Sequence, residues 1–156
     1  MSEINLPLVC AIIWVVSLCL IGGLMTPRVD WYEKLRKPSW QPPGWAFGPA
    51  WTIILGLAGW AAVRAWNAGD PAQHRDVLIL FGVNGAFHLA WSPLFFKAQR
   101  PDWALIEVPF LWTSVLAMVI GLWTIDQLAA LLILPYLAWV AFAAALNWKV
   151  VDLNPR

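Results

Sequence analysis

Five long apolar stretches constrain what this chain can fold into more than any other feature. A helix needs about 20 mostly apolar residues to cross roughly 30 Å of hydrocarbon. The 156 residues are 61% hydrophobic and only 12% charged, whereas soluble domains average about 25% charged residues. The pattern predicts an all-α integral membrane protein, a single five-helix bundle over residues 1–156, with spans at 6–25, 45–66, 77–96, 103–123 and 127–148.

The links between the predicted spans are short, which favours antiparallel neighbours. The segments "NAGDPAQHRD" at 67–76 and "KAQRPD" at 97–102 have the composition of ordinary turns. Four prolines lie inside the spans, where neighbouring helices can satisfy the carbonyls that proline leaves free. We therefore expect kinks and not breaks at Pro49, Pro93, Pro109 and Pro135.

The Lys and Arg residues flanking the spans predict an orientation. Only Arg64 and Arg75 fall on one side of the predicted bundle; the other side carries Arg28, Lys34, Arg36, Lys37, Lys97, Arg100, Lys149 and Arg156. Cationic flanks favour the cytoplasm, which predicts a cytoplasmic loop 28–44, a cytoplasmic C-terminus and an N-terminus outside. The first stretch lacks a basic leader and a small-residue cleavage site, so we interpret it as a retained span and not a signal peptide.

Composition also argues against several classes of function. A net charge of +1 gives no support to a nucleic-acid partner. Cys10 and Cys19 lie nine residues apart on one apolar stretch, about 13–14 Å along a helix, which is too far for a disulfide. No metal-ligand cluster accompanies them, and no internal inverted repeat of the kind found in many secondary transporters is visible.

The third span has two distinct faces. Asn84, His88 and Trp91 share one face by the spacing i, i+4, i+7. Polar groups at membrane depth are costly and tend to face cavities, so this face predicts either the lining of a pocket or hydrogen bonding across the bundle. The imidazole of His88 is also a candidate axial ligand for heme iron.

The opposite face of the third span is a row of small residues. Gly82, Ala86 and Ala90 recur every four residues, and small residues let helix backbones approach closely within a membrane. We expect this row to contact another helix and propose it as the interface of a homodimer.

Two further groups of side chains complete the candidates from the spans. Glu107 is the one acid within an apolar span, which predicts an interfacial or bundle-bonding carboxylate, or a polar group of a pocket. Tyr136, Trp139 and Ala143 share a face of the fifth span. Large rings followed by small side chains suit a slot for a flat ligand, but close helix packing would look the same.

The segment "WYEKLRKPSWQPPGW" at 31–45 links the first two spans. Residues that precede proline favour extended backbone, so we expect a stiff loop that is not helical. Its aromatic rings and cations suit a lid over the mouth of the bundle. The alternative is an anchor in the lipid headgroups, which does not account for so many prolines.

This segment resembles the hallmark of a known family. The pattern W-Y-x-x-L-x-K-P-x-W-x-P-P at 31–43 is similar to that of the translocator protein (TspO/MBR) family, whose members are also called tryptophan-rich sensory proteins or peripheral-type benzodiazepine receptors. The similarity continues through Trp51, "AWSPLFF" at 90–96, "WAL" at 103–105 and "PYLAWVAFAAALNW" at 135–148. It covers about residues 5–150.

The resemblance implies a dimeric five-helix bundle with a pocket beneath the first loop. That pocket would bind tetrapyrroles such as protoporphyrin IX and heme, and also isoquinoline-carboxamide and benzodiazepine ligands. No cofactor is expected to be required. Together with the face analysis, the resemblance predicts a ligand-binding set of Tyr32, Trp40, Pro42, Trp51, Asn84, His88, Trp91, Glu107, Trp139, Ala143 and Leu146.

The chain departs from the family pattern at two places. Family members usually carry Asn where this chain has His88, so the preference among tetrapyrroles is expected to differ. The cholesterol-recognition pattern of animal members needs a Tyr near the end of the fifth span, and none is present beside Lys149. The resemblance therefore does not extend to cholesterol binding.

Three functions remain open at the level of sequence. We favour a tetrapyrrole-binding sensor or regulator in a bacterial cell envelope. The alternatives are light- and oxygen-dependent degradation of protoporphyrin, with Trp51 and Trp139 as candidate catalytic residues, and translocation of porphyrin or lipid. No catalytic triad or carboxylate pair is visible, so a binding protein is expected and not an enzyme.

Overall fold

The computed structural model is a bundle of long helices and describes residues 5–26 and 30–155. Five helices have the length and apolarity to cross a membrane: α1 (Leu6–Leu24), α3 (Gly44–Ala68), α4 (Pro71–Ser92) continued by η1 (Pro93–Lys97), α5 (Pro101–Trp123) and α6 (Gln127–Leu153). The predicted fold class is confirmed. Of the cations that predicted orientation, Arg28 and Arg156 lie outside the described residues.

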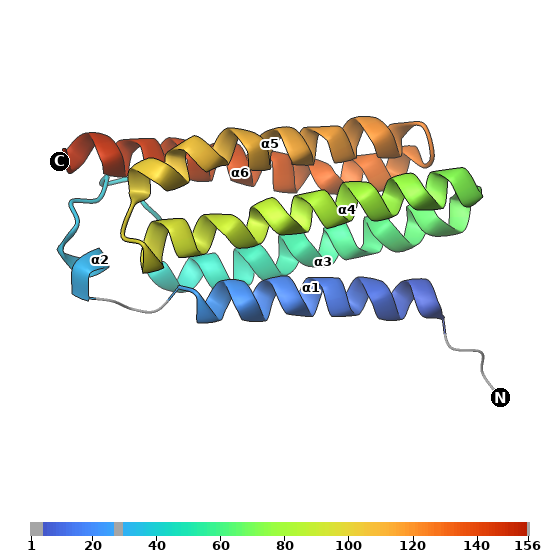
Figure 1. The fold of residues 1–156 in the computed structure, drawn as a ribbon, viewed down its shortest axis with the longest axis horizontal. Coiled ribbons are helices and arrows are strands. Elements are labelled where there is room, and N and C mark those ends of the chain that lie inside the picture. Colours follow the sequence, from blue (N-terminus) through green and yellow to red (C-terminus); the bar gives the residue numbers. More distant parts are fainter. Residues whose placement is uncertain (1–4, 27–29, 156) are drawn as a thin grey trace.

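Consecutive spans run antiparallel, and the five spans close into a ring in which α1 and α4 are parallel neighbours (Figure 1). Around the ring the order is α1, α3, α6, α5, α4 and back to α1, and α1 forms one edge of the bundle (Figure 1). The loop between α1 and α3, the link between η1 and α5, and the C-terminal end of α6 lie at one end. The two remaining links lie at the other end (Figure 1).

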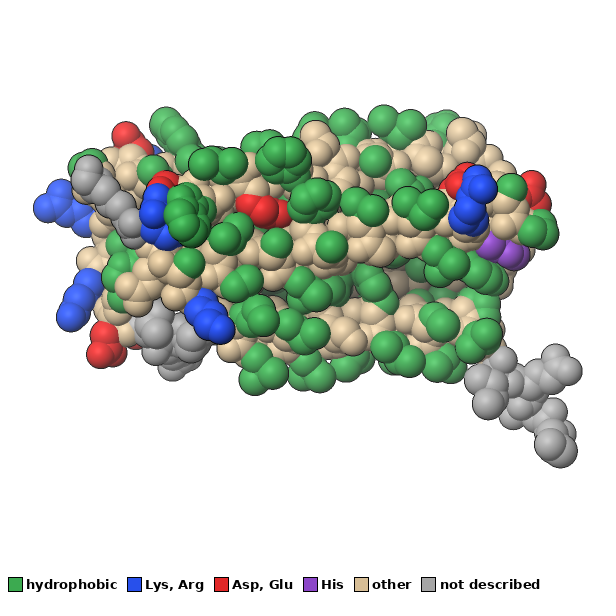
Figure 2. All heavy atoms as spheres, viewed as in Figure 1, with side chains coloured by type: hydrophobic (Ala, Val, Ile, Leu, Met, Phe, Trp, Pro, Cys, Tyr) green, Lys and Arg blue, Asp and Glu red, His purple; other side chains and the backbone are tan. Residues whose placement is uncertain are grey.

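Small residues let the helices approach closely. Leu55, Ala58, Ala61 and Ala65 form a fully buried stripe along α3. Gly59 faces α1, where an added Cβ would lie 2.6 Å from the Cγ2 atom of Val15. Outside these contacts, large apolar side chains cover the bundle between its two ends (Figure 2), which suits a surface that contacts lipid.

The prolines do not break the spans. The helices continue through Pro49, Pro109 and Pro135, as expected where partners within the bundle satisfy freed groups. A side chain from a neighbouring helix also bonds the backbone at the start of α5: the Asn147 amide, oriented to satisfy both groups, donates to the Pro101 carbonyl (3.2 Å) and accepts from the Leu105 N–H (2.9 Å). At Pro93 the α-helix changes to the π-helical turn η1.

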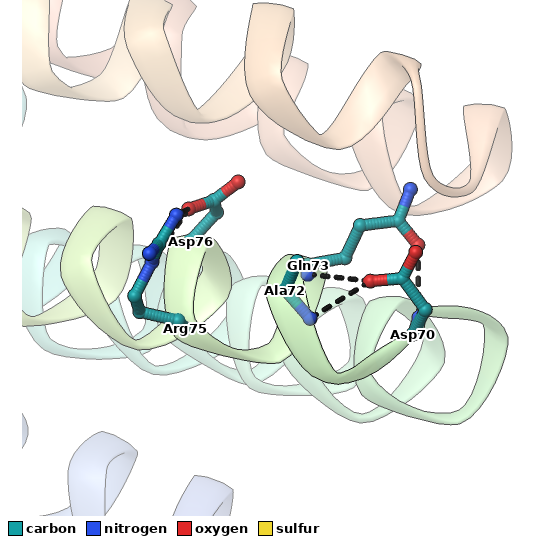
Figure 3. Close-up of polar contacts among 5 residues, drawn as sticks. All are labelled: Asp70, Ala72, Gln73, Arg75 and Asp76. Carbon is teal, nitrogen blue, oxygen red and sulfur yellow. Dashed lines mark hydrogen bonds and ion pairs between the residues drawn. The ribbon is translucent and has the colours of Figure 1, made fainter.

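Helix α4, the predicted third span, begins six residues before its predicted start, and most of 67–76, which was predicted to be a turn, is helical; only Gly69 and Asp70 link the two helices. The Asp70 carboxylate accepts from the Ala72 and Gln73 backbone N–H groups, both at 2.9 Å, and the Gln73 side chain accepts from the Asp70 N–H (Figure 3). With Pro71 at the first helical position, this capping box starts the helix outside the apolar stretch.

Two other boundaries also differ from the prediction. The sixth helix extends past residue 148 to Leu153, where the Asn154 side chain donates to the Val150 carbonyl at 2.8 Å. The loop between the first two spans was expected to be free of helix, but Asp30–Lys34 forms the short helix α2. No proline restricts these residues, and acids in the first turn with a lysine in the last favour a helix.

An ion pair joins the ends of two spans at the side away from the loop. Arg64 of α3 bonds Asp126 at 2.7 Å, and Asp126 caps α6 by accepting from the Ala129 N–H at 2.7 Å. The Ala129 N–H first, and then the Arg64 guanidinium, hold the pKa of Asp126 below its usual value. This carboxylate therefore stabilises the start of α6 and its attachment to α3.

We predict that Asp70→Ala lowers the free energy of unfolding by about 1 kcal/mol, because it removes the acceptor of two N–H groups at the start of α4. Denaturant unfolding in detergent measures the change. Asp76→Ala is the matched control: its ion pair with Arg75 is exposed (53% and 74%) and is worth little. Equal losses in both variants would contradict the role of the capping box.

Candidate functional site

A chain of buried polar side chains links three helices at the centre of the candidate site. The Asn84 amide of α4 donates to the Ser114 hydroxyl of α5 at 3.0 Å. The Tyr136 hydroxyl of α6 lies 3.2 Å from the Asn84 amide oxygen and 2.8 Å from Nδ1 of His88. Asn84 and His88 thus bond across the bundle, one of the two roles that their spacing left open.

Aromatic rings enclose this polar chain. Trp51 of α3 stands edge-on to three rings, with centroids 4.9 Å from His88, 6.0 Å from Tyr136 and 6.1 Å from Trp139. Trp139 in turn contacts Phe47 of α3 at 6.0 Å. The predicted members Trp51, His88 and Trp139 are therefore brought together, and their rings fill the space between α3, α4 and α6.

Trp91 lies one step nearer the loop than this ring cluster. It stacks on Phe95 at 5.0 Å and meets Phe96 edge-on at 5.9 Å. Tyr32 of α2 contacts the same two phenylalanines. The predicted face of the third span thus continues from the bundle interior to the underside of the loop.

Several polar atoms in this region are buried without a hydrogen-bond partner among the described residues: Nε1 of Trp91 and of Trp139, both carboxylate oxygens of Glu107, and Oε1 of Gln41. Native proteins leave few such groups, and each one calls for an explanation. Glu107 is only 8% exposed, and the bond across the bundle that was one of its predicted roles is not formed among the described residues.

The loop is tied to the helix ends beneath it. The Asn154 amide accepts from the Arg36 N–H and donates to the Arg36 carbonyl, both at 2.9 Å. The Gln41 amide donates to the Tyr32 hydroxyl at 3.2 Å, and the Lys37 ammonium lies 4.3 Å from the Tyr32 ring centre. Burial raises the pKa of Tyr32, and the bond from Gln41 opposes that shift.

Trp40 connects the loop to the ring cluster. Its ring meets Phe142 of α6 at 5.8 Å, and Phe142 contacts Trp139 at 5.4 Å. The Trp40 side chain is still 48% exposed. Three other predicted residues, Pro42, Ala143 and Leu146, are partly buried.

Cations gather at the end of the bundle that carries the loop (Figure 2). Arg100 pairs with Asp102, and Lys149 with Asp152. Within the described part of the chain, no ion pair is formed by Lys34, Arg36 or Lys97. These three cations lie in the loop and at the end of η1, in the part of the bundle that also carries the acids Asp30 and Glu33 of α2.

Two open grooves flank α1 instead of leading into the ring cluster. One lies between α1 and α4, has a volume of about 440 Å³ and is lined in part by Gly82 and Ala86. The other lies between α1 and α3 and has a volume of about 560 Å³. Trp51 and Trp139 line neither groove, and the small-residue row faces outward.

Comparison with known proteins decides the family. The model of the TspO/MBR family matches residues 9–152. The chain belongs to this family. Tryptophan-rich protein TspO of Chlorobaculum tepidum is 35% identical over 147 residues, covering 90% of this chain and 93% of that protein. The predicted resemblance is confirmed, and the chain is an integral membrane protein.

Other family members come from distant organisms. The translocator protein of Homo sapiens is 35% identical over 136 residues, covering 85% of this chain and 80% of that protein. The tryptophan-rich sensory protein of Cereibacter sphaeroides is 35% identical over 133 residues, covering 85% and 82%. Each of these two proteins is thus similar to this chain over 85% of its length.

Sequence reasoning missed several residues of the site. Ser114 follows Thr113 within an apolar stretch, where a hydroxyl indicates a hydrogen bond. Phe47 and Phe142 carry no sequence signal that separates them from other core aromatics. Asn154 lies past the last apolar stretch, and nothing in its neighbourhood indicates a contact with the loop.

We predict that Asn84→Ala lowers the free energy of unfolding by about 1 kcal/mol, because it removes the link between Ser114 and Tyr136. Unfolding in detergent measures the loss. Asn67→Ala, at an exposed position near the end of α3, is the control and should change little. A null effect at Asn84 would show that the polar chain contributes no stability.

Proposed function

We propose that this protein is a membrane sensor or regulator that binds a tetrapyrrole, protoporphyrin IX or heme, between α3, α4 and α6 beneath the loop. The observation that carries the proposal is the pair of buried indole N–H groups of Trp91 and Trp139, which lack an acceptor among the described residues. Both flank an array of aromatic faces suited to a flat ligand.

Charge at the mouth of the site supports the choice of ligand class. Protoporphyrin IX and heme each carry two propionate groups. Lys34, Arg36 and Lys97 have no ion-pair partner in the described segments and lie at the end where the loop covers the bundle. Cations at a cleft attract an anionic ligand and orient its charged edge outward.

Ligand binding requires the rings to separate. Trp139 packs against both Trp51 and Phe47, so a macrocycle fits only after these rings change rotamer. Trp40 is the natural point of access, because its side chain is half exposed and its ring packs against Phe142. We therefore expect the loop to open at Trp40 when a ligand binds.

His88 gives this site a feature that distinguishes heme from protoporphyrin IX. Nδ1 of the ring faces the Tyr136 hydroxyl, and Nε2 forms no hydrogen bond with another described residue. A neutral imidazole nitrogen is a common ligand of heme iron. The residues present fit either ligand, with His88 adding affinity only for the iron-bearing one.

The names of two relatives, a translocator protein and a tryptophan-rich sensory protein, favour translocation or sensing. We propose sensing, because many transporters work by moving one structural repeat against another. Five spans closed into a single ring do not form two such repeats. Uptake of porphyrin into sealed vesicles containing the protein would instead support translocation.

A tryptophan-quenching titration in detergent, in the dark, tests the binding proposal. Wild type should show saturable quenching by protoporphyrin IX and by heme. Trp139→Phe should weaken binding of both by about fivefold, the equivalent of one lost hydrogen bond. Trp60→Phe is the control, because Trp60 is an exposed indole on α3 outside the proposed site.

The His88→Asn variant separates the two ligands. Selective loss of heme affinity, with protoporphyrin IX binding unchanged, would show that the imidazole of His88 binds the heme iron. Equal heme affinities in wild type and variant would show that His88 does not bind the iron. Non-saturable quenching by both tetrapyrroles in wild type would overturn the proposed function.

We also propose that the protein is a homodimer through Gly82, Ala86 and Ala90. Ala86 is exposed on α4 and an added Cβ at Gly82 meets nothing within 4 Å, so this row is open to a second copy. Ala86→Leu should shift the protein in detergent toward monomer, as measured by light scattering. Ala117→Leu, at an exposed alanine of α5, should not.

A further inference from the structure

The hydrogen bond between Tyr136 and His88 has a consequence beyond packing. The Tyr136 side chain is fully buried, and its hydroxyl has one proton for two neighbours, Nδ1 of His88 at 2.8 Å and the amide oxygen of Asn84 at 3.2 Å. The shorter contact is to the imidazole. With the ring proton on Nε2, Nδ1 can accept the phenol proton; with the ring proton on Nδ1, the hydroxyl donates to Asn84 instead. The redox chemistry requires the first tautomer, whereas iron ligation through Nε2 requires the second.

Removal of an electron from a phenol makes its proton strongly acidic, so oxidation and deprotonation go together. In a buried site no bulk water can take that proton, and an unpaired charge is costly there. An amide oxygen such as that of Asn84 is too weak a base. The imidazole of His88 is a base already within hydrogen-bond distance.

A neighbouring ring provides a route for the electron. The indole of Trp51 touches both members of the pair, with centroids 4.9 Å from His88 and 6.0 Å from Tyr136. Trp139 adds a second indole 6.1 Å from Trp51. These contacts place an oxidisable ring directly beside the phenol and the imidazole.

We propose that Tyr136 and His88 form a one-electron redox site that reduces an oxidised Trp51. A one-electron oxidant, such as a photoexcited aromatic ligand, takes an electron from Trp51 and leaves an indole radical cation. Tyr136 then gives an electron to that indole, while its phenol proton moves to Nδ1 of His88. The products are neutral Trp51, a neutral tyrosyl radical and an imidazolium, so charge and atoms balance.

This redox site depends on the histidine and not on the hydrogen bond alone. Asparagine at position 88 would still reach toward the hydroxyl but could not hold a proton. The proposal does not require a tetrapyrrole, because any oxidant that reaches Trp51 suffices. The redox proposal can therefore be tested without assuming that the protein binds a tetrapyrrole.

Flash oxidation tests the site in the full-length protein in detergent, without tetrapyrrole. Ruthenium tris-bipyridine with persulfate is the photo-oxidant, and electron paramagnetic resonance with transient absorption follows the radicals. The chain has two tyrosines, which makes assignment direct. A tyrosyl radical should form in wild type and in Tyr32→Phe and be absent in Tyr136→Phe.

The proton acceptor is tested in the same experiment. His88→Asn should slow formation of the tyrosyl radical by about a hundredfold, the usual contribution of a positioned base. Trp51→Phe should also slow it, and Trp60→Phe should not. Wild type should react more slowly in D₂O. A far-ultraviolet circular dichroism spectrum and an elution profile in detergent that match those of wild type show that Tyr136→Phe is folded.

Three outcomes would overturn the proposal. One is a tyrosyl signal that persists in Tyr136→Phe and disappears in Tyr32→Phe. Another is an unchanged rate in His88→Asn, which would mean that the hydrogen bond is only structural. The third is an unchanged rate in wild type in D₂O, which would mean that no proton moves with the electron.

Discussion

Inside a bilayer no water can bond the backbone, so every N–H and C=O group of a span must find its partner within the protein. This constraint accounts for the long helices and for the way that they continue through Pro49, Pro109 and Pro135. It also accounts for the Asn147 amide, which bonds the backbone of α5 from the neighbouring helix.

The same constraint divides the side chains of the site into two groups. Asn84, Ser114, Tyr136 and His88 satisfy one another and tie α4, α5 and α6 together. The indole N–H groups of Trp91 and Trp139 and the Glu107 carboxylate remain without partners in the described structure. The binding proposal rests on the second group and the redox proposal on the first, so one site supports two separable inferences.

Hydrophobicity predicted the spans well but their ends poorly. An apolar stretch marks the thickness of the bilayer, whereas a helix ends where its terminal N–H and C=O groups find caps. Asp70 starts α4 before the apolar stretch begins, and α6 runs on to Leu153 after it ends. The helix α2 was missed because the prolines that make the loop extended all lie after Lys37.

The sequence by itself determined the five membrane helices, the family, and the placement of Asn84, His88 and Trp91 on one helix face. Those properties depend on local composition, motif and the period of the helix. Only the tertiary structure decided that His88 meets Tyr136, 48 residues away, and that Asn154 holds Arg36, 118 residues away. A hydrogen bond forms only within a few tenths of an ångström of its preferred length, and that approach is set by how whole helices pack.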